Sequence, residues 1–220
     1  MELYLALVVV TLVIGLGAQW FVRHQLKRYS GVPSVTQATG AQVAMGMLNY
    51  YGLSHVQVRP GGHDEDFFDP RTNSITLDPE VFYGNSVTAT ATACHEVGHA
   101  CQYAQGYAPM KFRSALVPAV NFVSNVWIFV LLFGVMLNML GLVQLAIAFY
   151  AVAVLFQVVT LPVEFNASHR AMGYLQAVGL HAQERSGAQS VLTACALTYV
   201  AAALVSVLQL LYLLAVNRDD

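Results

Sequence analysis

Three long, strongly apolar runs without a charged residue limit what this chain can fold into. They cover residues 3–22, 114–163 and 186–217, which are 20, 50 and 32 residues long. A helix that crosses a bilayer needs about 20 apolar residues, so the first and last runs each predict one span. The middle run is long enough for two spans joined by a turn at residues 138–141. Only 10% of the residues are charged, against about 25% in soluble domains, so we expect a polytopic membrane protein with four transmembrane helices.

The apolar runs divide the chain into five segments. We expect residues 1–28 to form a transmembrane anchor with a basic collar, 29–113 an α+β region, 114–163 a transmembrane hairpin, 164–185 a helix, and 186–220 a C-terminal span. The first run has basic residues after it and none before it, the reverse of a cleaved signal peptide, so we expect it to be retained. The net charge of −2 gives no indication of nucleic-acid binding.

A His-Glu-x-x-His motif occupies residues 95–99, inside a stretch (86–105) that suits a helix. Positions i and i+4 of a helix share a face, so His95 and His99 can bind one zinc ion through their imidazole nitrogens. Glu96 lies about 100° round the helix and is not placed as a ligand. It can take a proton from a zinc-bound water, so the motif predicts one Zn2+ per chain with Glu96 as the general base.

A catalytic zinc ion usually has three protein ligands and one open position, so the motif requires a third ligand. Glu164 is the next acidic residue after Glu96, and it directly follows the middle apolar run. Pro162 suits the first turn of a helix, which would mount Glu164 rigidly near the membrane surface. We therefore expect Glu164 to be the third ligand. Glu184 is the alternative, in a stretch with the composition of a solvated loop.

Two stretches ahead of the motif are further candidates for a functional role. The residues Ser74, Ile75, Thr76 and Leu77 have the composition of a strand, and we expect a sheet edge there that holds an extended substrate by main-chain hydrogen bonds. The stretch at residues 63–70 is the densest polar cluster in the chain. A calcium or second metal site is one interpretation, but the spacing fits no standard oxygen-ligand loop and favours a solvated loop.

Four blocks of sequence carry a family resemblance: His-Glu-Val-Gly-His-Ala at 95–100, Tyr-Ala-Pro at 107–109, Leu-Pro-Val-Glu-Phe-Asn-Ala-Ser at 161–168, and Leu-Thr-Tyr-Val-Ala-Ala at 197–202. Together they resemble the membrane-bound neutral zinc metallopeptidases of bacteria (YugP-like), from residue 30 almost to the end. The resemblance implies a zinc-dependent membrane protease with His95, His99 and Glu164 as zinc ligands and Glu96 as catalytic base. The block at Glu164 is more distantly similar to the third-ligand helix of Ste24-type and HtpX-type gluzincins, which usually carry Asp where this chain has Ser168.

The fold expected from these observations is mainly α, with four transmembrane helices and a small α+β, zincin-like catalytic region. The expected function is a gluzincin-type metalloendopeptidase in membrane-protein quality control or processing. Its partners would be the lipid bilayer and a protein or peptide substrate in or near the membrane. Peptide hydrolysis also needs a donor to the tetrahedral oxyanion besides the metal. The candidates for that role, or for orienting the ligands, are Tyr103, Asn166, His169, Arg170, Tyr174 and His181.

Two alternative functions remain open at the level of sequence. A non-catalytic membrane scaffold with a structural zinc would need a fourth protein ligand, for which His63 and His169 are candidates. A membrane enzyme of another chemistry could also carry the same motif.

The distribution of basic residues predicts the orientation in the membrane. With four spans, nine of the ten Lys and Arg residues fall on one side and Arg218 falls on the other. Positive charge near the ends of spans favours the cytoplasmic face. We therefore expect a multi-pass protein of the bacterial plasma membrane whose active site faces the cytosol.

Overall fold

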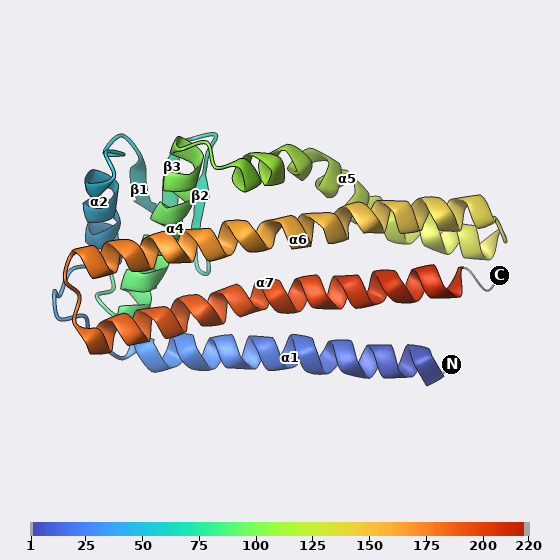
Figure 1. The fold of residues 1–220 in the computed structure, drawn as a ribbon, viewed down its shortest axis with the longest axis horizontal. Helices are drawn as coiled ribbons and strands as arrows, with labels where there is room; N and C mark the ends of the chain where they lie inside the picture. Colours follow the sequence, from blue (N-terminus) through green and yellow to red (C-terminus); the bar gives the residue numbers. More distant parts are fainter. Residues whose placement is uncertain (1, 218–220) are drawn as a thin grey trace. The chain divides into compact units, whose positions relative to one another are not determined.

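The computed structural model describes residues 2–217, which form seven helices and three strands (Figure 1). The chain divides into two compact units. One comprises the described parts of residues 1–18, 108–161 and 198–220, and the other comprises residues 19–107 and 162–197. In chain order, the elements are α1 (Glu2–Ser30), α2 (Gly40–Tyr50), β1 (Gln57–Pro60), β2 (Phe67–Asp69), β3 (Ser74–Leu77), α3 (Pro79–Phe82), α4 (Val87–Ala104), α5 (Ala108–Met136), α6 (Leu140–Ala177) and α7 (Ala182–Val216).

Four of the described helices are long and apolar enough to cross a membrane, as the sequence predicts. They are α1, α5, α6 and α7. Large apolar side chains such as Phe129 and Phe133 on α5 are more than half exposed, which suits a lipid environment and not water. The predicted hairpin in the middle run is confirmed, because α5 ends at Met136 and α6 begins at Leu140. Asn138 makes the turn between them with a left-handed φ of 52°.

The helix boundaries around the third and fourth spans differ from those expected. α6 runs unbroken from Leu140 to Ala177, so the predicted helix start near Pro162 is wrong. Proline removes one helical hydrogen bond, but membrane helices tolerate this loss where neighbouring groups compensate. Glu164 is therefore carried by the same continuous helix as the third span. α7 begins at Ala182, so Glu184 lies in the first turn of a helix, where it is only 7% exposed, and not in a solvated loop.

The helix before the first strand, α2, spans Gly40–Tyr50. Thr39 is the N-cap, and its side chain and that of Gln42 form a reciprocal capping box. The helix ends ahead of Gly52, which has a φ of 73° that suits glycine.

The sheet has three strands in the order β1-β3-β2, so β3 lies in the centre. It pairs in parallel with β1 and antiparallel with β2, and all four of its residues are buried. The strand prediction for Ser74–Leu77 is confirmed, but the prediction that Ser74, Ile75, Thr76 and Leu77 form a substrate-binding edge is wrong. Both sides of β3 are already paired, so an added peptide could pair only with β1 or β2, and β2 packs against α4 (Figure 1).

The acidic stretch at residues 63–70 is only partly solvated. Its last part contributes β2, and Phe68 is buried. The Asp78 carboxylate accepts a hydrogen bond from the Asp64 backbone at 2.6 Å and lies 3.0 Å from His63 Nδ1. Asp66 Oδ1 in turn accepts from the Asp78 backbone at 2.9 Å. These contacts tie the stretch to the end of β3.

Candidate metal centre

The His-Glu-x-x-His motif lies on a helix, as expected. α4 begins after Ser86, whose side chain caps the helix by accepting from the Ala89 backbone at 3.1 Å. The imidazole rings of His95 and His99 lie on one face with their centroids 4.7 Å apart. The helical period alone therefore brings the two histidines together.

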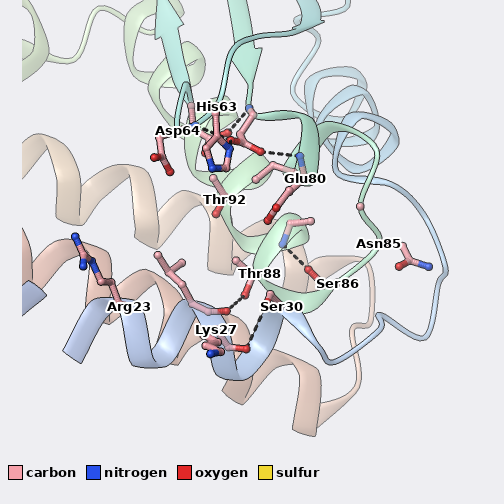
Figure 2. A pocket seen from close by; sticks show the side chains of 16 residues that line it. Arg23, Lys27, Ser30, His63, Asp64, Glu80, Asn85, Ser86, Thr88 and Thr92 are labelled. Carbon is pink, nitrogen blue, oxygen red and sulfur yellow. Dashed lines mark hydrogen bonds and ion pairs between the residues drawn. The ribbon is translucent and has the colours of Figure 1, made fainter. Parts of the chain in front are cut away.

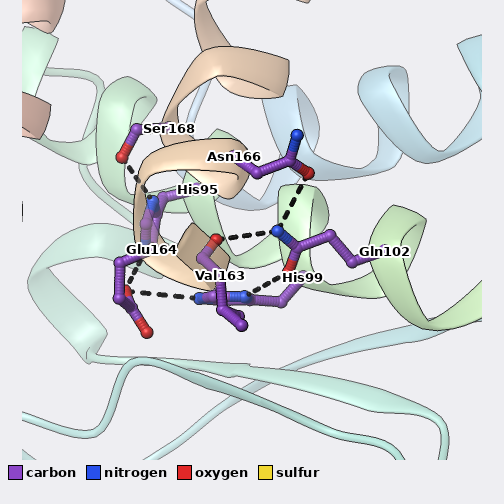
Figure 3. A network of polar contacts seen from close by, with 7 residues as sticks. All are labelled: His95, His99, Gln102, Val163, Glu164, Asn166 and Ser168. Atoms are coloured by element: carbon purple, nitrogen blue, oxygen red, sulfur yellow. Dashed lines mark hydrogen bonds and ion pairs between the residues drawn. The ribbon is translucent and has the colours of Figure 1, made fainter. Parts of the chain in front are cut away.

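Glu164 joins the two histidines from α6. Its Oε2 lies 3.2 Å from His95 Nε2 and 3.7 Å from His99 Nε2 (Figure 3). One ligand atom from each of the three residues lies within 4.8 Å of the others, and Glu164 is only 2% exposed. Two imidazole nitrogens and one carboxylate oxygen are the donor set of a catalytic zinc site, so these residues fit the metal that the motif predicts. Glu184 lies outside this group.

A close approach between α4 and α6 brings the three side chains together. Gly98 lies between the two histidines, and a Cβ atom built there would be 2.6 Å from the Ala167 carbonyl oxygen. Ala167 is itself fully buried. The small residues at this crossing let the two backbones come close enough for Glu164 to reach the histidines.

Gln102 orients His99, a role that the sequence did not predict. Its Oε1 lies 3.0 Å from His99 Nδ1, while its Nε2 donates to Val163 O at 2.7 Å and to Asn166 Oδ1 at 3.0 Å (Figure 3). Because the amide nitrogen is engaged in this way, the amide oxygen accepts the proton of His99 Nδ1. The lone pair of His99 Nε2 is then directed at the site. The sequence feature that indicates this contact is the i, i+3 spacing of His99 and Gln102, because side chains three residues apart are neighbours on a helix.

Ser168 is the corresponding partner of His95. Its Oγ lies 3.2 Å from His95 Nδ1, one helical turn after Glu164. A hydroxyl, and not a carboxylate, makes this contact. If Ser168 accepts the Nδ1 proton, the lone pair of His95 Nε2 is also directed at the site.

Two of the six residues that the sequence offers as oxyanion donors or ligand-orienting groups, Asn166 and Arg170, join the hydrogen-bond network of Gln102. Arg170 Nε donates to Asn166 Oδ1 at 2.7 Å, and Arg170 Nη1 donates to Gln105 Oε1 at 2.7 Å. Asn166 thus links Gln102 to Arg170. The other four have no hydrogen bond or ion pair to the histidines or Glu164 among the described residues: Tyr103, His169, Tyr174 and His181.

The surroundings of these four residues explain why they stay apart. Tyr103 is half exposed, with its ring 5.8 Å from that of Phe68. The Tyr174 ring packs 5.5 Å from that of Tyr50. His169 and His181 line other cavities. The structure thus gives no contact by which these four residues orient the ligands.

Glu96 is buried beside the triad, with 7% of its surface exposed, and it is not one of the three clustered residues. Its charge affects two neighbours. Burial lowers the pKa of His99, but the Glu164 carboxylate and the charge of Glu96 outweigh burial and raise that pKa above its ordinary value. Burial, helped by the charge of Glu96, raises the pKa of Asp66 to about 6 against the effect of the Asp78 backbone hydrogen bond.

A cavity of about 640 Å³ lies along the first turns of α4 (Figure 2). Thr88 and Thr92 line it from α4, one helical turn apart, and Glu96 follows one turn later. Arg23 and Lys27 of α1 line one side, and acidic residues line the other. The acidic residues are Asp64, Asp66, Asp78 and Glu80.

Comparisons with known proteins relate this chain to zinc peptidases. Residues 4–218 match the model of a family described as "Putative neutral zinc metallopeptidase". The chain is 40% identical over 223 residues to a protein of Bacillus subtilis (strain 168) named "Putative membrane protease YugP", and the match covers 99% of each chain. No solved structure matches the chain.

Proposed function

The chain belongs to the neutral zinc metallopeptidase family, and on this premise we propose that it is a membrane-embedded zinc endopeptidase of the gluzincin type. The observation that carries the proposal is the convergence of His95, His99 and Glu164 within 4.8 Å, with Glu96 buried beside them. Each histidine has a polar partner at Nδ1, which leaves Nε2 for a metal.

In this proposal one Zn2+ per chain is held by His95, His99 and Glu164. Three protein ligands leave a coordination position open, as hydrolysis requires and a structural zinc site does not. The two candidates for a closing fourth ligand do not support the scaffold alternative. His63 contacts Asp78, and His169 has no contact with the cluster among the described residues. We therefore favour the protease over a scaffold.

When bound, the zinc ion would polarise the scissile carbonyl and lower the pKa of a water molecule. Glu96 then accepts a proton from that water and later delivers it to the leaving amine. Its position on α4 next to His95, outside the ligand group, suits this role. Gln102 and Ser168 hold the imidazole rings in place while this happens.

The 640 Å³ cavity is our candidate for the space that receives the substrate chain. It lies along the helix that carries His95 and His99 and is lined by Thr92, one turn ahead of Glu96. Basic groups on one side and acidic groups on the other provide partners for the polar groups of an extended peptide. We propose that the substrate is a membrane-bound or membrane-proximal protein, because Glu164 directly follows the long apolar run of residues 114–163.

The test of the function is cleavage of an unfolded protein, such as casein, by the zinc-loaded enzyme in detergent. The wild type should cut it, and Glu96→Gln should retain zinc but lose activity by a factor of at least 100, because only the base is changed. Thr92→Trp should keep zinc and raise KM by narrowing the cavity. Undiminished cleavage by Glu96→Gln would remove Glu96 from the mechanism, and no cleavage by the zinc-loaded wild type would contradict the protease assignment.

We also propose that the active site faces the cytosol in the bacterial plasma membrane. The support is the charge distribution: Arg23, Lys27 and Arg28 follow the charge-free run of residues 3–22, and Lys111 and Arg113 precede that of residues 114–163. Arg218, the one basic residue on the opposite side in this arrangement, lies outside the described residues.

A further inference from the structure

A groove lies between α6 and α7, where the charge-free run of residues 114–163 ends and that of residues 186–217 begins. It consists of two cavities, of about 510 and 220 Å³. The cavities are continuous, because three residues line both of them: His169, Met172 and Gln189. Since charged residues flank a span where it leaves the hydrocarbon, we expect the groove to lie at the membrane surface.

The two cavities differ in the side chains that line them. The larger one, between residues 169–176 of α6 and 182–189 of α7, has five polar side chains: His169, Gln176, Arg185, Ser186 and Gln189. Three apolar side chains line only the smaller one: Phe165, Leu192 and Ala196. These three lie farther along α6 and α7 towards the middle of the spans. The groove is therefore polar at its outer end and more apolar towards the bilayer, as a phospholipid is.

The outer end of the groove carries a positive charge without a compensating group. Arg185 is the only Lys or Arg in the lining that the structure describes, which contains no Asp or Glu. Its guanidinium has no hydrogen bond or ion pair among the described residues. His169 and Gln176 line the same cavity and add N–H donors. An arginine together with further N–H donors is suited to the oxygens of a phosphate group.

Gly173 keeps space free at the outer end. It lines the larger cavity, and a Cβ atom built there would have no heavy atom within 4 Å. A volume of about 510 Å³ lies within the roughly 300–1,000 Å³ typical of ligand pockets, so this end can take a lipid headgroup. Towards the bilayer, the Phe165 side chain is 50% exposed and offers an apolar contact to an acyl chain.

We propose that this groove binds one anionic phospholipid, with its phosphate at Arg185 and His169 and the upper part of an acyl chain along Phe165. Basic pockets between transmembrane helices are suited to anionic headgroups. A zwitterionic lipid is disfavoured, because the described lining has no carboxylate to pair with its ammonium group. No residue of the metal triad lines the groove, so this role does not depend on the proposed function.

The test is native mass spectrometry of the full-length protein in a non-ionic detergent, titrated with dioleoyl phosphatidylglycerol and, separately, with dioleoyl phosphatidylcholine. The wild type should bind one phosphatidylglycerol saturably, with an affinity at least about fivefold higher than for phosphatidylcholine. Arg185→Gln should weaken phosphatidylglycerol binding at least about fivefold and leave phosphatidylcholine binding unchanged, because only the charge is lost. Gly173→Phe fills the outer end and should weaken phosphatidylglycerol binding by a similar factor.

Arg28→Gln is the matched control, because Arg28 is an exposed arginine beside the first apolar run and lines neither cavity. It should bind phosphatidylglycerol as the wild type does, which accounts for general attraction of anionic lipid to basic residues. Glycerol 3-phosphate in about tenfold excess should not displace the lipid, since it has no acyl chain for the apolar end.

Thermal unfolding identifies the variants that are folded, and Gly173→Phe decides the question if Arg185→Gln is not. Four results would each overturn the proposal: equal wild-type affinity for the two lipids, wild-type phosphatidylglycerol binding by the folded groove variants, an equal loss in Arg28→Gln, or displacement of the lipid by glycerol 3-phosphate.

Discussion

Gln102 fixes the orientation of His99 through the 3.0 Å contact between Gln102 Oε1 and His99 Nδ1. Both residues are on α4, but the direction of the amide is set by α6, whose Val163 carbonyl and Asn166 side chain accept from the Gln102 nitrogen. The nitrogen that His99 presents to a metal therefore depends on how the two helices pack.

Gln102→Leu should weaken zinc binding about 10- to 100-fold, because His99 loses the partner that fixes its tautomer. Zinc affinity can be measured by competition with a chromogenic chelator. Gln102→Glu should recover part of the affinity, since a carboxylate can still accept from Nδ1. Gln105→Leu is the matched control, because Gln105 contacts Arg170 and not His99. Equal affinities for Gln102→Leu and Gln105→Leu would show that Gln102 has no orienting role.

Gly98→Ala should weaken zinc binding and destabilise the fold by about 1–3 kcal/mol, because the added methyl group would overlap the Ala167 carbonyl and push α6 away. Zinc affinity and thermal unfolding in detergent would be measured together. Gly173→Ala on α6 is the control, since nothing lies within 4 Å of its added Cβ, and it should be neutral or stabilising. A fully stable Gly98→Ala with wild-type zinc affinity would contradict the close-packing argument.

The metal content of purified variants should separate the ligands from the base. The wild type should carry one zinc ion per chain by plasma emission spectroscopy. His95→Ala, His99→Ala and Glu164→Ala should each lose it, because two protein ligands hold zinc poorly. Glu96→Gln should retain it, and loss of zinc from that variant would make Glu96 a ligand. Full occupancy in Glu164→Ala would place the third ligand elsewhere.

The stability of the metal-free protein should fall as pH rises from about 4 to about 6. The pKa of Asp66 is about 6 in the folded state and 3.8 as its ordinary value. Its stabilising contribution is therefore full below about pH 4 and is lost as pH rises through about 6. Asp66 is partly exposed, so we expect a loss of only about 1 kcal/mol.

Asp66→Asn should flatten this pH dependence, because its amide oxygen can still accept from the Asp78 backbone. Thermal unfolding would be followed in a chelating buffer, since bound zinc would itself favour the ionised carboxylate. An Asp66→Asn variant with the wild-type pH profile would show that the dependence arises from another group.

Impermeant thiol labelling of intact cells should report the orientation. In a variant with Cys94, Cys101 and Cys195 replaced, Glu65→Cys should be labelled only after permeabilisation, because it precedes α4 on the proposed cytosolic side. Met139→Cys lies in the turn between α5 and α6 and should be labelled without permeabilisation. The reverse pattern would place the protease outside the cell.

The sequence by itself determined the features that depend on local periodicity and length. The 3.6-residue period places His95 and His99 on one face, and the length of the apolar runs predicts four candidate spans. Both signals lie within single segments, so they can be interpreted without knowing what packs against them. The choice of Glu164 followed from the need for a third ligand, and the structure places it beside the histidines.

Only the tertiary structure decided which residues from distant segments meet. The composition of Ser74–Leu77 predicts a strand, but its central position depends on pairing with β1 and β2. The composition around Glu184 predicts solvation, whereas packing buries its carboxylate against the Val35 backbone, 149 residues away in the chain. Ser168 and Gln102 acquire their roles from the crossing of α4 and α6. Polar side chains have several possible partners in sequence, and the geometry of packing selects among them.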